Sequence, residues 1–155
     1  MSSSEAPTRP IDDDRANTCT LITVSCTTSW FDWIHGELWL CQAGLLRRSV
    51  GLTKTIAHGS RPTVDPAVRP TRTFGLDEIA NILAAGRRNR WITWAEIAHA
   101  TLKRGVIDHS LHLDLGIGRR EKLLWLRTDG GYDLLEGALA RALPGRFTAV
   151  DKAIS

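Results

Sequence analysis

The sequence predicts a β-rich α+β fold, on three observations. Leu111, Leu113 and Leu115 alternate with polar residues, which is the period of a strand with one buried face. Residues 18–30 are rich in β-branched and aromatic side chains, which favour strands. Two segments, at 76–85 and 135–143, show the apolar spacing of amphipathic helices. The length of 155 residues predicts a single domain.

The first half of the chain is predicted to form strands. A strand beginning at Thr18 precedes a second one at 37–42, and the turn Ala43-Gly44 leads into a third at 45–50, which makes a hairpin. Residues 53–57 predict a further strand. Proline lacks the N–H group that a strand or helix needs, so the three evenly spaced prolines that follow predict an extended loop. They are Pro62, Pro66 and Pro70.

The two helices differ in how their ends are marked. The helix predicted at 76–85 carries Asp77 and Glu78 in its first turn, where they complement the positive end of the helix dipole. The later helix has a leucine at every fourth position and ends before Pro144 and Gly145. It is therefore predicted to be the last regular element.

The segment at 92–105 decides the architecture, because its sequence fits either a helix or a strand. Thr93 and Glu96 have the spacing of a capping box, which predicts a helix continuing through Leu102. The order helix, helix, hairpin, helix resembles winged-helix DNA-binding domains and would imply a nucleic-acid-binding protein. Alternatively, residues 97–104 form a long strand that pairs with 110–115.

The second interpretation carries a family resemblance. An I-x-W-x-x-I pattern at 92–97 is followed by a polar strand, the alternating leucine strand, a glycine turn, a Leu-Leu-Trp strand at 122–127 and a closing helix. Residues 18–147 thereby resemble bacterial pleckstrin-homology-like (PH-like) domains. The resemblance implies a bent antiparallel sheet or split barrel capped by the C-terminal helix, with the helix at 76–85 inserted.

The segments outside this domain are predicted to be tails. Residues 1–17 are rich in Ser, Pro and Asp and predict a disordered N-terminal tail, and residues 148–155 predict a C-terminal tail. The net charge of the chain is +3, but the N-terminal tail carries four acids against two bases. The domain is therefore more basic than the chain, which permits binding to phosphates or to an anionic surface.

The sequence predicts a non-catalytic binding module. It contains no G-x-S-x-G, Walker A, G-x-G-x-x-G or H-E-x-x-H motif, and we expect no cofactor. His109 and His112 would lie on opposite faces of a strand, which argues against one shared metal. The Gly116–Gly118 segment predicts a hairpin turn, since no helix follows it.

The candidate ligand-binding residues are basic side chains at strand ends and turns, together with one tryptophan. They are Arg87, Arg88, Arg90, Trp91, Lys103, Arg104, Arg119 and Arg120. Arginine forks suit phosphates and carboxylates. We expect a protein segment as the partner, with an anionic lipid or phosphate group as a second possibility and nucleic acid stacked on Trp91 as a third. The first hairpin turn contains no basic residue.

Cysteine use and hydropathy predict a cytoplasmic protein. The three cysteines are an odd number without C-x-x-C spacing, which favours thiols that act as small apolar residues in a reducing compartment. The first residues lack the apolar stretch of a signal peptide, and no run approaches the about 20 apolar residues that span a bilayer. Among the six tryptophans, Trp39, Trp94 and Trp125 are predicted to lie in the core.

Overall fold

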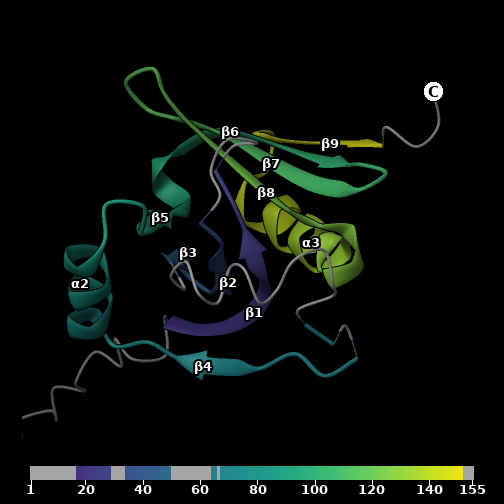
Figure 1. Ribbon diagram of the computed structural model, residues 1–155. Coiled ribbons are helices and arrows are strands. Elements are labelled where there is room, and N and C mark those ends of the chain that lie inside the picture. Colours follow the sequence, from purple (N-terminus) through teal and green to yellow (C-terminus); the bar gives the residue numbers. More distant parts are fainter. Residues whose placement is uncertain (1–16, 29–33, 50–63, 66, 152–155) are drawn as a thin grey trace, which may run out of the picture.

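The computed structural model describes residues 17–28, 34–49, 64–65 and 67–151, which form two β-sheets and two α-helices (Figure 1). The β-rich α+β class is confirmed, and the described strands do not close into a barrel. The first sheet has the order β4-β1-β2-β3-β5. Its strands are β1 (Thr18–Cys26), β2 (Gly36–Cys41), β3 (Gly44–Ser49), β4 (Thr71–Thr73) and β5 (Arg90–Thr93).

The second sheet has the order β8-β7-β6-β9. Its strands are β6 (Ile97–Arg104), β7 (Asp108–Leu115), β8 (Arg119–Leu126) and β9 (Phe147–Asp151). Thr27 follows β1 and exchanges two backbone hydrogen bonds of 2.8 Å with Leu124 of β8, which joins the two sheets at one corner. β9 runs parallel to β6, so residues 148–151, which the sequence assigned to a tail, belong to this sheet.

The segment with two interpretations is a strand. The capping box between Thr93 and Glu96 is present, but it starts only a single 3-10 turn, Trp94–Glu96, before β6 begins. The helix through Leu102, and with it the winged-helix interpretation, is therefore wrong. The physical reason is sheet pairing: β6 lies between β7 and β9, and its buried residues Ile97, Ala100 and Leu102 face the core.

The main core lies between the two sheets and contains α3 (Tyr132–Ala142). Leu135 and Leu139 of this helix pack with Ile22 and Leu38 of the first sheet and with Trp125 of the second. The C-terminal helix is confirmed; it contacts β6 and β9, and Figure 1 shows it below the strands of the second sheet. Trp125 is 1% exposed, as predicted for a core residue, whereas Trp94 is half-buried at the edge of this core.

A second apolar cluster covers the other face of the first sheet. The helix α2 (Leu76–Ala85) has the predicted bounds and buries Ile79 and Ile82 in this cluster. Phe74 packs edge-on against Trp39 with ring centroids 5.1 Å apart. Trp39 is thus buried, but on the face opposite the main core. No helix in the described part of the chain is long and apolar enough to cross a membrane.

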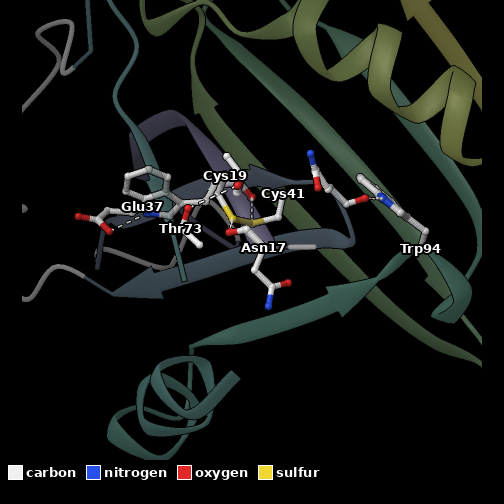
Figure 2. Close-up of a disulfide and its surroundings, with 9 residues drawn as sticks. Asn17, Cys19, Glu37, Cys41, Thr73 and Trp94 are labelled. Atoms are coloured by element: carbon white, nitrogen blue, oxygen red, sulfur yellow. Dashed lines mark hydrogen bonds between the residues drawn. A yellow bond between two sulfur atoms is a disulfide. The ribbon is translucent and has the colours of Figure 1, made fainter. Parts of the chain in front are cut away.

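Two of the three cysteines form a disulfide, which corrects the prediction that all are thiols. Cys19 of β1 and Cys41 of β2 are register partners in adjacent antiparallel strands, and their sulfurs are bonded at 1.99 Å (Figure 2). Spacing along the chain does not reveal this pair, because the register of β1 and β2 includes two irregularities. Cys26 is buried outside this disulfide. The predicted strand at 53–57 lies outside the described residues.

Candidate anion-binding site

The structure separates the predicted basic residues into groups at opposite ends of the second sheet. β6 and β7 are antiparallel strands of eight residues, so each spans about 25 Å. Lys103 and Arg104 lie where β6 turns into β7, whereas Arg119 and Arg120 lie where β7 turns into β8. Figure 1 shows these two turns at opposite ends of the sheet. The predicted set therefore does not form one site.

Carboxylates neutralise much of the charge at the β7–β8 end. Glu121 accepts a hydrogen bond from Arg90 at 3.1 Å and lies 3.6 Å from Arg119, and Arg120 lies 3.3 Å from Asp114. Of the other predicted residues, Arg87 and Arg88 are exposed in the turn after α2, and Trp91 packs half-buried against the second apolar cluster. This end shows no cavity lined by these arginines among the described pockets.

The other end contains a pocket of about 460 Å³ at the N-terminus of α3. We call it the arginine pocket. It is lined by Arg69, Arg104, His109, Arg127, Gly130, Gly131, Tyr132, Asp133 and Leu134. The loop before β4, the end of β6, the start of β7, the 3-10 turn Arg127–Asp129 after β8, and the first turn of α3 with the two glycines before it all contribute to the pocket. Arg104 is thus the one predicted ligand-binding residue that lines this pocket.

Two glycines shape the floor of the arginine pocket. Gly130 and Gly131 have φ angles of 67° and 83°, in the region that glycine adopts without strain. A Cβ on Gly131 would also lie 2.7 Å from the Cγ2 atom of Ile22. Within the described residues no side chain caps α3, whose N-terminal N–H groups therefore remain available for water or a ligand.

Arg69 is held in place by backbone carbonyl groups. Its Nη1 donates to the oxygens of Ile22 at 2.8 Å and Leu21 at 3.2 Å, and its Nη2 donates to the oxygen of Asp129 at 2.6 Å. Burial lowers the pKa of Arg69, and the charge of Asp129 opposes that shift. No described carboxylate lies within salt-bridge distance of Arg69, and the buried Asp129 acts on its charge from a longer distance.

Arg104 and Arg127 differ in their pairing. Arg104 donates to Asp133 at 2.9 Å, lies 3.8 Å from Asp151 and stacks 3.9 Å from the centre of the Tyr132 ring. Burial opposes these contacts, which together raise the pKa of Arg104. Arg127 is exposed, and its Nη1 donates only a long 3.5 Å hydrogen bond to a backbone carbonyl. Across the described ranges it has no carboxylate partner.

His109 adds an uncharged ring to the pocket. It is 2% exposed, its ring centroid lies 5.7 Å from that of Trp125 and 5.2 Å from that of Tyr132, and its Nδ1 has no hydrogen-bond partner in the described structure. Burial, together with the charges of Arg104 and Arg127, lowers the pKa of His109 to about 4, although the charges of Asp133 and Asp151 oppose the shift. The imidazole is therefore neutral at pH 7, when it offers one N–H donor.

Sequence reasoning missed Arg69, Arg127 and His109. Arg69 follows the proline-rich loop, whose path no local pattern predicts. The spacing of His109 and His112 suggests only a metal-ligand pair, and among the described residues no group of three His, Cys, Asp or Glu side chains could hold a metal. The signal that was present is the Gly130-Gly131 pair directly before an amphipathic helix, a typical setting for an open helix N-terminus.

A second hollow of about 550 Å³ lies between β2, Trp94 and the last turns of α3. Leu40, Cys41 and Ala142 line it, and Arg141 is its only charged side chain in the described residues. It lacks the convergence of charge found in the arginine pocket, which is therefore the stronger candidate site. In the comparisons with known proteins, neither a protein-family model nor a curated protein matches this chain.

Proposed function

We propose that this protein is a non-catalytic, PH-like binding module whose arginine pocket takes an anionic group with phosphate-like oxygens. The observation that carries the proposal is the convergence of three guanidinium groups on the uncapped N-terminus of α3. Arginine forks and helix N–H groups both donate to oxyanions, and the helix dipole favours negative charge at this position.

The order of the elements supports the PH-like part of the proposal. Antiparallel strands β1, β2, β3 and β5 precede the antiparallel strands β6, β7 and β8, and α3 then packs into the core between the two sheets. The helix α2 interrupts the first group of strands, as expected for an insertion. In this architecture the module binds through a surface pocket and requires no catalytic residue.

The charges in the pocket favour a dianion over a neutral ligand. Arg127 has no carboxylate partner among the described residues, Arg69 is opposed only by the buried Asp129, and Arg104 shares its charge with Asp133 and Asp151. The neutral His109 ring supplies a donor without adding charge. An incoming phosphate would meet the guanidinium group of Arg127 first, and Arg104 would then exchange an exposed carboxylate for the ligand.

Titration with inorganic phosphate tests the proposal. We expect amide signals of Gly130, Gly131 and Tyr132 to shift in NMR spectra as phosphate is added at constant ionic strength, with saturation. Arg127→Gln should weaken binding by about tenfold or more, because a hydrogen bond to a charged group contributes about 1.5–3 kcal/mol. Added salt should weaken these shifts less than it weakens the shifts of a fully exposed contact, because salt screens partly buried charges less.

Arg119→Gln is the matched control. It removes the same charge at the opposite end of the second sheet, so it changes the net charge equally and leaves the pocket intact. We expect it to bind phosphate like the unaltered protein. Equal weakening by both substitutions would show that phosphate responds to net charge alone, and an absence of saturable shifts would exclude the pocket as an anion site.

A further inference from the structure

We propose that the second hollow, between β2, Trp94 and the last turns of α3, binds a small aromatic carboxylate. We call it the tryptophan hollow. It lies at the opposite end of α3 from the arginine pocket. This inference goes beyond the proposed function, because it assigns a second site with a ligand of different chemistry. Three features carry it: apolar walls, a single cation, and a glycine within α3 that leaves room for that cation.

The tryptophan hollow continues the main core outward. Leu40 lies two residues after the buried Leu38 on the same face of β2, and it packs partly buried against that core. Ala138 and Ala142 lie one turn apart on α3, and their small side chains leave the space between helix and sheet open. The volume of about 550 Å³ falls within the range of about 300–1,000 Å³ that holds small organic ligands.

Trp94 gives the hollow an aromatic wall that is held in position. Its indole N–H donates to the backbone oxygen of Gln42 at 2.7 Å (Figure 2), and its backbone N–H donates to the oxygen of Ala43 at 3.2 Å. The side chain is half-buried against the main core, and it also lines the hollow. A side chain that is already ordered loses little entropy when a ligand packs against it. The indole ring therefore favours a flat aromatic ligand.

Arg141 gives the hollow one positive charge. It is the only charged side chain that lines the hollow in the described residues, it is exposed, and within the same ranges it forms no salt bridge. Thr20, the register partner of Leu40, also lines the hollow and adds a hydroxyl group. A guanidinium fork and a hydroxyl both donate to carboxylate oxygens. A single cation beside apolar walls thus complements a ligand with one carboxylate and an apolar body.

Gly137 makes room for the Arg141 side chain alongside α3. Glycine is unfavourable inside a helix, yet a Cβ at this position would lie 3.3 Å from Nη1 of Arg141. The guanidinium therefore extends back by about one turn, towards the middle of the helix. This position matters because the negative end of the helix dipole, at the last carbonyl groups, would repel a carboxylate. The cation is presented where that repulsion is weaker.

NMR titration of the full chain with naphthylacetate tests this inference. We expect saturable shifts of the Trp94 indole N–H signal and of the Ala138 amide signal. The corresponding naphthylethanol has the same ring without the charge, and it should bind about tenfold or more weakly, because hydrogen bonds between charged groups are stronger than those to a neutral hydroxyl. An absence of saturable shifts, or equal affinity for the acid and the alcohol, would overturn the inference.

Arg141→Gln tests the role of the cation. It should weaken binding of naphthylacetate by about tenfold or more and leave binding of naphthylethanol unchanged, because only the acid uses the charge. Arg127→Gln removes the same charge from the arginine pocket, so it should weaken phosphate binding and leave naphthylacetate binding unchanged. Unchanged affinity of Arg141→Gln for the acid would overturn the inference, and so would naphthylacetate shifts confined to Gly130 and Gly131. Neither result would affect phosphate binding, so this inference and the proposed function fail separately.

Ala138→Leu tests the location of the ligand by filling the hollow. Leucine is a strong helix former, so we expect the variant to fold and to lose binding of both the acid and the alcohol. Ala140→Leu is the matched control, because it makes the same exchange at an exposed position of the same helix that does not line the hollow. Unchanged binding in Ala138→Leu, or equal loss in both variants, would show that the ligand does not occupy the tryptophan hollow.

Discussion

The imidazole of His109 is nearly inaccessible to water, yet its Nδ1 has no hydrogen-bond partner among the described residues. An unpaired polar atom of this kind costs free energy, and protonation of the ring would cost more. The nearest charged groups include Arg104 and Arg127, which disfavour the imidazolium ion, and Asp133 and Asp151, which favour it. Burial and the two arginines prevail, so the pKa of His109 falls to about 4.

This pKa predicts a loss of stability in mild acid. The pKa of a histidine in the unfolded chain is about 6.5, so between pH 6.5 and pH 4 the unfolded state binds a proton that the folded state does not. The contribution is fully present above pH 6.5 and is lost as the pH falls towards 4. At pH 5 the free energy of unfolding should be lower than at pH 7 by about 2 kcal/mol from this residue.

Urea unfolding of the unaltered protein and His109→Gln at both pH values measures that contribution. The variant lacks the titrating ring, so its free energy of unfolding should change less between pH 7 and pH 5, by the same about 2 kcal/mol. All other titrating groups are common to the two proteins, and their effects cancel in the comparison. Identical pH dependence of the two proteins would contradict the depressed pKa.

At the scale of elements, local patterns predicted regular structure well where one face of the element is buried. The helix α2 and the strands β2, β3 and β7 lie close to where apolar spacing places them. The capping box at Thr93 and Glu96 was recognised correctly but did not decide the following element. Its energy is small beside the pairing of β6 with strands on both sides, which no local pattern contains.

The disulfide also depends on strand pairing that no local pattern contains, and it leads to a prediction about the stability that β1 and β2 gain from it. Cys19 and Cys41 are 22 residues apart, and a crosslink over such a loop stabilises a domain by about 3 kcal/mol through the entropy of the unfolded chain. A phosphine reductant should therefore lower the midpoint of urea unfolding by a corresponding amount.

The double variant Cys19→Ser and Cys41→Ser controls for other effects of the reductant. It retains Cys26 and lacks the crosslink, so its unfolding midpoint should be the same with and without reductant. Mass spectrometry of the unreduced, unaltered protein should recover the peptides of Cys19 and Cys41 joined together. A midpoint of the unaltered protein that does not respond to complete reduction would show that the disulfide contributes no stability.

At the scale of the whole molecule, the candidate site depends on contacts that a linear pattern does not contain. The sequence predicted that basic residues gather at strand ends, which holds for Arg104, Arg119 and Arg120. It did not predict which ends meet, because that depends on the strand order of the second sheet and on the path of the loop that carries Arg69. Composition therefore indicates that basic residues make up the site, and the strand order determines which of them lie together in the arginine pocket.

The same dependence on topology links anion binding to folding. Arg69, Arg104, Arg127 and the first turn of α3 are far apart in the chain, so the arginine pocket exists only in the folded state. A ligand that binds only the folded state at about 100 times its Kd stabilises it by about 2.7 kcal/mol. For a domain of this size, that corresponds to a rise in Tm of about 5–10 °C.

Phosphate should therefore raise the Tm above its value in sodium chloride of the same ionic strength. Phosphate also stabilises proteins without binding them, because it is excluded from their surfaces. Arg127→Gln isolates that general effect, since it retains the fold and weakens the pocket, and its Tm should rise less than that of the unaltered protein. Arg119→Gln should show the full rise, because its charge lies at the other end of the sheet. A rise of the same size in all three proteins would mean that phosphate acts by exclusion alone and that folding does not assemble an anion site.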